Sequence, residues 1–224
     1  MGCGNSSNPT ASRTTAAINT SSGLPLPSSL PESQYQAKLY AFLGSFEYRQ
    51  KGWPKDKRIR DTGPYKDGKY FGTHPAVKIY YSPEMIQWIA QGRKGEVPDG
   101  AMMIKEMYLP PAARYEGSPE PLPTQWTVMV RDKAGGFDGW YWSYYGSDPP
   151  QAPDNNDFPF PYPNSGFGLY CVRCHGSAES LMTFASTDNI EGFPGSPIKY
   201  EVDDSWKAAQ GAPPDPHPNA REIK

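Results

Sequence analysis

Apolar residues recur at helical spacing between residues 31 and 48, with polar residues between them. This periodicity is typical of a helix that buries one face against a core. The residues on the apolar face are Tyr35, Leu39, Phe42, Leu43 and Phe46. A second, shorter helix is predicted after Ser82, because serine is a good N-cap and Pro83 suits the first helical position. This second helix is expected to stop at Gly92.

Four other stretches have the composition of β-strands. They are residues 76–81, 101–109, 125–131 and 139–145, which are rich in β-branched, aromatic and other large apolar side chains. The Ala-Gly-Gly run at 134–136 predicts a turn that joins the last two as antiparallel partners. Loops are expected at 49–73 and 146–166, and a short helix within 167–180. This order of elements predicts an α+β fold with an antiparallel β-sheet and flanking helices.

The second of these stretches, 101–109, matters for chemistry because it contains a lysine on an apolar face. Period-two alternation places Met103, Lys105, Met107 and Leu109 on one side of the strand. One interpretation is an edge-strand lysine whose ammonium reaches water. The other is a lysine desolvated beside a cofactor, whose pKa falls so that its neutral amine becomes a nucleophile.

Residues 171–175 read Cys-Val-Arg-Cys-His, the C-x-x-C-H signature of c-type haem attachment. In such a site, Cys171 and Cys174 form thioethers with the two haem vinyl groups. His175 would then be the proximal ligand of the iron. The motif therefore predicts a covalently bound haem c, attached outside the cytoplasm, and redox or small-gas chemistry at its iron.

A Cys-x-x-Cys pair has two other common interpretations. A thioredoxin-like redox pair requires a βαβ context, whereas the residues around the motif are rich in Gly, Pro and aromatic side chains. A zinc site requires further ligands, and the candidates elsewhere are Cys3, His74 and His217. Haem c is the favoured interpretation.

Composition and charge bear on possible partners and on the domain boundaries. The chain has 224 residues and a net charge of −2, which gives no electrostatic footprint for nucleic acid. No apolar run approaches the length of a membrane span. We expect one haem domain over residues 31–195. Residues 1–30 and 196–224 are polar or Pro-rich and are predicted to be disordered tails.

Cys3 follows Gly2 at the start of the polar 1–30 segment. The first residues superficially fit N-myristoylation, but that cytosolic reaction conflicts with haem c attachment. Cys3 could also be an incidental thiol. We favour a third interpretation, in which Gly-Cys ends a bacterial lipobox and an upstream signal peptide lies outside this sequence. The chain would then be periplasmic, as an outer-membrane lipoprotein tethered by residues 4–30, and would meet the membrane only through a lipid on Cys3.

Several segments resemble the cytochrome P-460 family in the correct order. Residues 95–100 read Gly-Glu-Val-Pro-Asp-Gly, and 103–106 read Met-Ile-Lys-Glu, which is similar to the central motif of that family. Residues 126–132 resemble its next strand. Gly-Trp-Tyr-Trp at 139–142 and the C-terminal C-x-x-C-H complete the pattern. The resemblance covers about residues 70 to 190.

The resemblance implies a small periplasmic protein, usually homodimeric, with an antiparallel sheet and one five-coordinate haem c. His175 would be proximal and the distal site open. In the founding members, which oxidise hydroxylamine to nitrogen oxides, a lysine is cross-linked to a meso carbon of the haem, and Lys105 aligns with it. Relatives called cytochrome c′-beta lack the link and bind nitric oxide or carbon monoxide. Lys105 favours the first group.

The sequence departs from the family pattern at two positions. Near the place of an acidic residue in the founding members, this chain has Thr127, and where they have an arginine in the first strand, it has Val77 and Lys78. His74 is a candidate distal group, a proton shuttle or sixth ligand, or else a plain loop histidine.

These observations predict a cytochrome that oxidises hydroxylamine and passes electrons to a partner cytochrome. The alternatives are a haem that binds nitric oxide without turnover, or an electron carrier with a methionine such as Met182 as its sixth ligand.

Overall fold

The structure is a computed structural model that describes residues 20–66, 69–72, 74–118, 121–146, 165–167, 171–178 and 180–200. The helices within these ranges are α1 (Glu32–Gly44), α2 (Glu47–Gln50), α3 (Pro83–Ala90) and α4 (Cys171–His175), with 3-10 turns at Pro27–Ser29, Ala112–Tyr115 and Thr187–Asn189. The strands are β1 (Tyr65–Lys66), β2 (Lys69–Tyr70), β3 (Ala76–Tyr81), β4 (Met102–Tyr108), β5 (Gln125–Arg131), β6 (Trp140–Gly146) and β7 (Ser165–Phe167).

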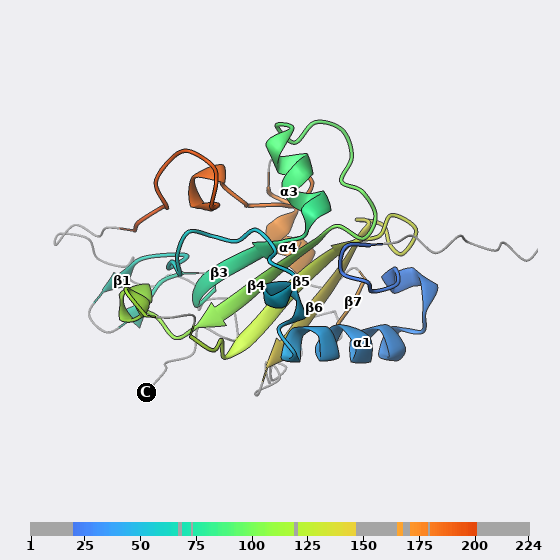
Figure 1. Ribbon diagram of the computed structural model, residues 1–224, viewed down its shortest axis with the longest axis horizontal. Helices are drawn as coiled ribbons and strands as arrows, with labels where there is room; N and C mark the ends of the chain where they lie inside the picture. The colour runs from blue at the N-terminus through green and yellow to red at the C-terminus, as the bar shows by residue number, and fades with distance from the viewer. Residues whose placement is uncertain are drawn as a thin grey trace, which may run out of the picture.

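The central element is a five-stranded sheet in the order β3-β4-β5-β6-β7, in which every neighbouring pair is antiparallel. β1 and β2 form a separate small hairpin. Helices lie on both sides of the sheet (Figure 1). The predicted α+β fold with an antiparallel sheet is therefore confirmed, and the four predicted strands are found at the expected positions.

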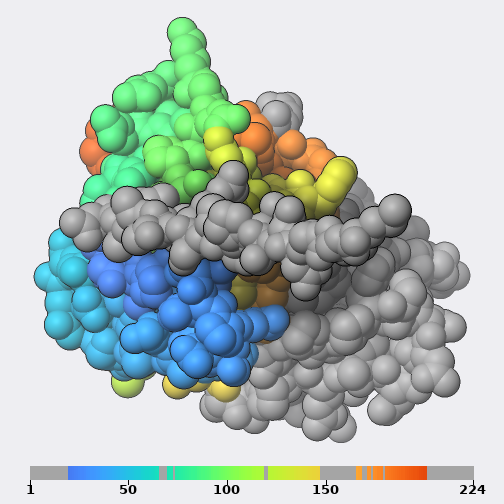
Figure 2. All heavy atoms as spheres, turned by 90° about the vertical axis from the view of Figure 1, so that its right-hand side faces the viewer, coloured from blue at the N-terminus to red at the C-terminus, as the bar shows by residue number. Residues whose placement is uncertain are grey.

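The two faces of the sheet carry two different cores. On one face, which we call the α4 face, side chains of β3 to β6 pack with α3 and with Cys171 and Val172 of α4. On the other, the α1 face, Tyr80, Ile104 and Val128 pack under Tyr35 and Leu39 of α1. Figure 2 shows α1 in blue and the α3 region in green on opposite sides of the molecule.

The local signals for α3 are confirmed in detail. The Ser82 hydroxyl accepts a hydrogen bond from the Met85 amide at 3.3 Å, as an N-cap should. Gly92 has a φ of 73°, a left-handed conformation that suits glycine after a helix end. This helix starts directly after β3, and its apolar side chains cover the α4 face.

The predicted helix over 31–48 is interrupted. α1 ends at Gly44, and Phe46 has a φ of 54°, which separates α1 from the short α2. The break turns the chain so that Tyr48 is fully buried and Phe46 is only partly buried. Helical spacing alone cannot reveal this change of direction, because the same residues fit one continuous helix.

The predicted loop at 49–73 contains ordered pairing. Besides the β1–β2 hairpin, Lys55 and Arg60 form bridges to Tyr80 and Val77, along the outer edge of β3. This segment therefore covers an edge that would otherwise present unpaired backbone groups. At the other edge, β7 was not predicted; most of the 146–166 loop lies outside the described residues.

The N-terminal segment differs from the expected tether over 1–30 in the part that the structure describes. From Thr20 onward it lies on the protein. Ser21 donates to Glu84 at the start of α3, and Ser28 donates to Asp132 after β5. No described helix has the length and apolar character needed to cross a bilayer.

A buried polar network on the α1 face supports β4. Glu106 is fully buried and accepts hydrogen bonds from Tyr48 at 2.5 Å and from Arg49 Nε at 2.7 Å, and another from Tyr108. Trp126 Nε1 donates to the Tyr48 hydroxyl at 2.9 Å. Each polar group of the cluster thus has a partner, as buried charges require.

Candidate haem-binding site

Lys105 lies on the α4 face in the middle of the sheet. β4 is an interior strand, and the cross-strand partners of Lys105 are Ile79 on β3 and Thr127 on β5. Directly opposite residues of paired strands point to the same face. The edge-strand interpretation is therefore wrong. The predicted row is confirmed for Met103, Lys105 and Met107 by the burial of both methionines on this face, whereas its fourth member, Leu109, lies past the end of β4 and is exposed.

The surroundings of Lys105 disfavour its charge. The residue is partly buried, and the desolvation of its ammonium lowers its pKa to about 8. The positive charge of Arg60 lowers this pKa further, while Cys171 and Asp56 act in the opposite direction. A substantial part of the Lys105 amine is therefore neutral near pH 8, as a nucleophilic lysine requires.

The C-x-x-C-H motif forms α4, and the structure brings it to the same face as Lys105. Cys171 packs against the α4-face core, close enough to Lys105 for each to influence the pKa of the other, while Cys174 is exposed. Burial raises the pKa of Cys171 to about 12. Because a thioredoxin-like nucleophile needs a lowered thiol pKa, this environment argues against the redox-pair interpretation.

His175, the last residue of α4, is oriented by a backbone carbonyl. Its Nδ1 lies 2.6 Å from the oxygen of Met182. A carbonyl can only accept, so Nδ1 carries the proton and Nε2 is the ring nitrogen suited to a metal. Histidines that bind metals usually donate their other N–H in this way. Met182, a candidate sixth ligand, contributes its carbonyl here and packs its side chain against the α4-face core.

The turn that presents this carbonyl has an unusual backbone. Leu181 and Met182 have φ values of 43° and 63°, although neither is glycine. Thr183 holds the turn through its amide and its hydroxyl, both of which donate to the oxygen of Ser180 at 2.9 and 2.8 Å. Side chains in this conformation cost free energy, and such outliers persist where the surroundings impose them.

Aromatic rings enclose the imidazole of His175. Trp142 of β6 approaches it edge-on at 4.8 Å between ring centroids, and Phe184 does so at 5.3 Å. Trp142 is itself fixed, because its indole N–H donates to Asp138 Oδ2 at 2.8 Å. Trp142 is thus the wall against which the predicted iron ligand is held.

This arrangement fits a c-type haem. Two thiols and a histidine lie on one short helix, the histidine is held in the tautomer that an axial ligand needs, and the helix packs against an apolar core. Within the described parts of the chain, no group of three or more His, Cys, Asp or Glu side chains is placed to hold a bare metal ion. Cys3 and His217 lie outside the described residues.

Sequence reasoning missed two charged residues beside Lys105. Asp56 is fully buried; its Oδ1 accepts from the Tyr81 hydroxyl at 2.9 Å, and its Oδ2 accepts from the Ile79 amide at 3.2 Å. Arg60 Nε lies 3.5 Å from Asp56 Oδ2. Nothing in the sequence marked this pair, because it reaches the α4 face through backbone pairing of the 54–60 segment with β3.

The remaining predicted positions are placed as follows. Thr127 is opposite Lys105, so no carboxylate stands at that position. His74 lies two residues before β3, and its backbone exchanges hydrogen bonds with the Thr62 hydroxyl. Lys105 is opposite Ile79, which is five residues after His74 along the chain. At the usual rise per residue of a strand, this separates His74 from Lys105 by roughly 16 Å. The distal role of His74 stays a prediction.

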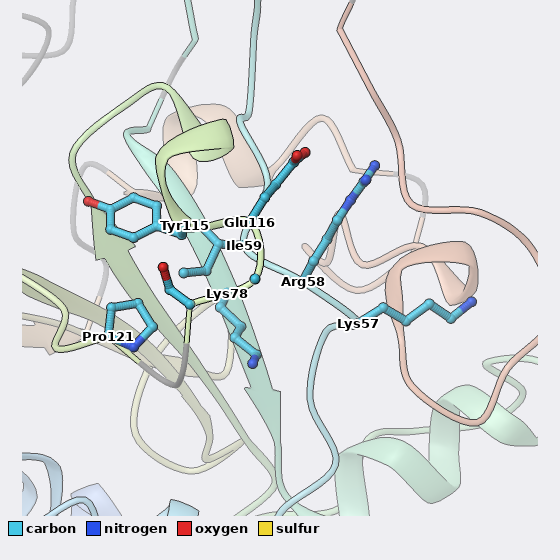
Figure 3. A pocket seen from close by; sticks show the side chains of 9 residues that line it. Lys57, Arg58, Ile59, Lys78, Tyr115, Glu116 and Pro121 are labelled. Atoms are coloured by element: carbon cyan, nitrogen blue, oxygen red, sulfur yellow. The ribbon is translucent and has the colours of Figure 1, made fainter.

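A pocket of about 500 Å³ opens elsewhere, on the outer side of β3 (Figure 3). Its walls include Lys57, Arg58, Lys78, Tyr115 and Glu116. Figure 3 shows the Lys57 and Arg58 side chains extending away from it. The pocket includes no residue of α4 and not Lys105, so it is separate from the haem-binding site proposed from α4.

Comparison with known proteins agrees with this geometry. The family model Cytochrome P460 matches residues 48–185, which include Asp56, Lys105, Thr127 and the C-x-x-C-H motif. The match begins earlier than the resemblance found by motif, and so takes in the 54–60 segment that pairs with β3. A search of curated proteins found no significant match.

Proposed function

Because the chain belongs to the cytochrome P460 family, and is therefore a haem-binding cytochrome, we propose that it oxidises hydroxylamine at a covalently attached haem c. In this proposal, Cys171 and Cys174 form the thioethers and His175 Nε2 binds the iron. The bound haem would supply an open coordination position for hydroxylamine and accept its electrons.

The chain's own residues have separable tasks in this proposal. α4 anchors the ring, and the Met182 carbonyl keeps His175 in the tautomer that donates through Nδ1. Trp142 and Phe184 limit rotation of the imidazole. Lys105 approaches from the sheet, and its lowered pKa favours the neutral amine that a cross-link to the haem requires.

The observation that carries the proposal is the meeting of Lys105 and α4 on one face. Lys105 is 66 positions before Cys171 in the sequence, yet the two side chains lie close enough for each to influence the pKa of the other. The meeting supports a lysine that modifies the macrocycle, the feature that separates hydroxylamine-oxidising members from gas-binding relatives. It would have no such meaning for a lysine whose side chain pointed to the α1 face.

The test is the absorption spectrum of the ferrous protein, matured with haem c, beside the Lys105→Ala variant. We expect a Soret band displaced far to the red in the native protein and restored to an ordinary position in the variant. Lys78→Ala is the matched control, because Lys78 pairs with Glu106 and shares its face, opposite to that of Lys105. An ordinary spectrum in all three proteins would contradict the cross-link.

Hydroxylamine oxidation is then measured with an artificial electron acceptor. We expect turnover in the native protein and in Lys78→Ala, and a large loss in Lys105→Ala. Equal turnover in all three proteins would contradict the proposed role of Lys105 in hydroxylamine oxidation.

One observation favours a second function, the binding of nitric oxide without turnover. Thr127 is opposite Lys105, near the place where the family resemblance aligns the acid of hydroxylamine-oxidising members, and a threonine hydroxyl is no general base. A five-coordinate haem that binds nitric oxide but fails to oxidise hydroxylamine would support this alternative.

We also propose that the protein is exported, since haem c is attached outside the cytoplasm. Its electron acceptor would be a cytochrome, and it would act as a homodimer, as the family resemblance implies. A lipid on Cys3 would hold it at the outer membrane. Membrane fractionation of the full-length precursor beside its Cys3→Ser variant tests the anchor, and sedimentation of the soluble form tests the dimer.

A further inference from the structure

Lys105 shares the α4 face with two other ionisable side chains, Asp56 and Arg60. Arg60 pairs directly with Val77, whose own side chain lies on the α4 face beside Met107. Because directly opposite residues point to the same side, the Arg60 side chain lies on the α4 face as well. It is nine-tenths buried.

Asp56 reaches the same region from one strand away. Its carboxylate binds the amide of Ile79, the residue directly opposite Lys105. Opposite Cα atoms in antiparallel pairs are about 5 Å apart, so the Asp56 carboxylate lies within roughly 10 Å of the Lys105 Cα. In a poorly solvated site, charges at such distances interact strongly enough to change protonation.

The Asp56–Arg60 pair is imperfect as a purely structural ion pair. Arg60 Nε lies 3.5 Å from Asp56 Oδ2, at the long end of the range for a hydrogen-bonded ion pair. Charge-assisted hydrogen bonds of full strength are shorter, about 2.7–2.9 Å. Each charge of the pair therefore also influences other ionisable groups nearby, Lys105 among them.

We propose that Asp56 and Arg60 act as a pair that sets the protonation of Lys105, Arg60 favouring the neutral amine and Asp56 the ammonium. This deepens the proposed function, in which Lys105 must be neutral to reach the haem. Neither residue touches the haem or hydroxylamine in this proposal; both are positioning residues that act through Lys105.

The charged groups around the pair support this assignment. Asp56 lies next to Arg60 and the Tyr81 hydroxyl. Burial raises the pKa of Tyr81, and Arg93, which follows α3 in the chain, acts to lower it. Lys105 faces Arg60, Asp56 and Cys171. Since burial keeps the Cys171 thiol protonated near neutral pH, and a thioether carries no charge at all, Asp56 is the anion that opposes Arg60. Burial raises the pKa of Asp56 to about 6, so it is ionised above that pH.

The test compares Asp56→Asn with Arg60→Met, which should act in opposite directions. In the full chain prepared without haem, the rate at which an amine reagent labels Lys105 is measured by peptide mass mapping from pH 6 to 9. At pH 7.5 a pKa of about 8 leaves roughly a quarter of the Lys105 amine neutral. A one-unit change in that pKa would therefore make labelling about 3-fold faster in Asp56→Asn and about 8-fold slower in Arg60→Met. In haem-loaded protein, the fraction of Lys105 linked to haem should change in the same order.

Two controls separate charge from structure. Arg58→Met removes a neighbouring arginine whose side chain binds the carbonyl of Pro197, so it should leave Lys105 labelling unchanged. Tyr81→Phe loosens Asp56 without removing a charge, and should also leave the rate within about twofold. Circular dichroism checks that each variant is folded.

Shifts in the same direction for Asp56→Asn and Arg60→Met, or no shift in either, would overturn the proposal. Because labelling without haem requires no hydroxylamine chemistry, this result is independent of the proposed activity. A protein that fails to oxidise hydroxylamine can still show the opposite shifts, and an active protein can lack them.

Discussion

The buried Glu106 network allows a quantitative prediction about the strand that carries Lys105. Glu106 is 0% exposed and its salt-bridge partner Arg49 is 13% exposed, with 2.6 Å between Nη2 and Oε1. Replacing Arg49 with Met leaves the carboxylate buried with only the Tyr48 and Tyr108 hydroxyls as donors. Removing one partner of a buried pair costs about 3–5 kcal/mol, because the remaining charge is uncompensated.

Urea denaturation measures this cost. At an m-value of about 2 kcal/mol/M, the midpoint of Arg49→Met should fall by about 1.5–2.5 M. Adding Glu106→Gln removes the orphaned charge, so the double variant should recover a large part of the loss. Lys51→Met is the matched control: its partner Glu47 is exposed and 3.4 Å away, so the loss should stay below about 0.5 kcal/mol.

The pH dependence of the Arg49→Met defect has a definite sign. Burial raises the pKa of Glu106, and Arg49 opposes that rise. Without Arg49 the folded-state pKa moves further above its unfolded value, so the folded state takes up a proton more readily. The deficit should therefore be small in acid and grow as pH rises through the folded-state pKa. A loss below about 1 kcal/mol at pH 8, or no gain from Glu106→Gln, would refute this reasoning.

Three further predictions concern the site. Burial raises the pKa of Asp56 from 3.8 to about 6. Its contribution to the free energy of unfolding is therefore present below pH 4 and is lost as the pH rises to 6, a change of about 3 kcal/mol that urea denaturation at each pH measures. In Asp56→Asn this pH dependence should be much smaller. Leu181→Gly should raise the free energy of unfolding by about 1 kcal/mol, because Leu181 is exposed and its φ of 43° is unfavourable for a residue with a side chain. The control Leu109→Gly, also at an exposed leucine, should lower it. Equal effects of the two changes would contradict backbone strain at Leu181. In the Lys105→Ala background, which removes the proposed cross-link, the further Cys171→Ser and Cys174→Ser changes should abolish covalent haem on a denaturing gel, whereas Cys3→Ser should keep it. Covalent haem retained without both cysteines in that background would exclude thioether attachment.

Much of the fold was predictable because its signals are local. Ser82 and Pro83 start α3 through capping and a fixed φ, and the alternation of residues along β4 placed Lys105 among methionines. Both depend on neighbours within a few positions, which is what a sequence displays directly. The C-x-x-C-H motif is local for the same reason, since one turn of helix carries all three side chains.

The errors arose where distant segments decide the outcome. The break at Phe46 and the pairing of residues 54–60 with β3 follow from packing and from backbone hydrogen bonds that any sequence can make. Backbone pairing leaves no side-chain signature, so a charged, Pro-containing stretch was predicted to be a loop. The same contacts brought Asp56 and Arg60 to the α4 face.

The sequence by itself determined which residues are the candidates for attaching and ligating a haem, which face Lys105 takes, and the order of strands along the chain. The tertiary structure decided which side of the sheet α4 covers, that Lys105 is interior, and which charges surround it. The reason is the range of the forces. Capping, alternation and motif spacing operate over a few residues, whereas burial and electrostatics depend on every element that folds against the group.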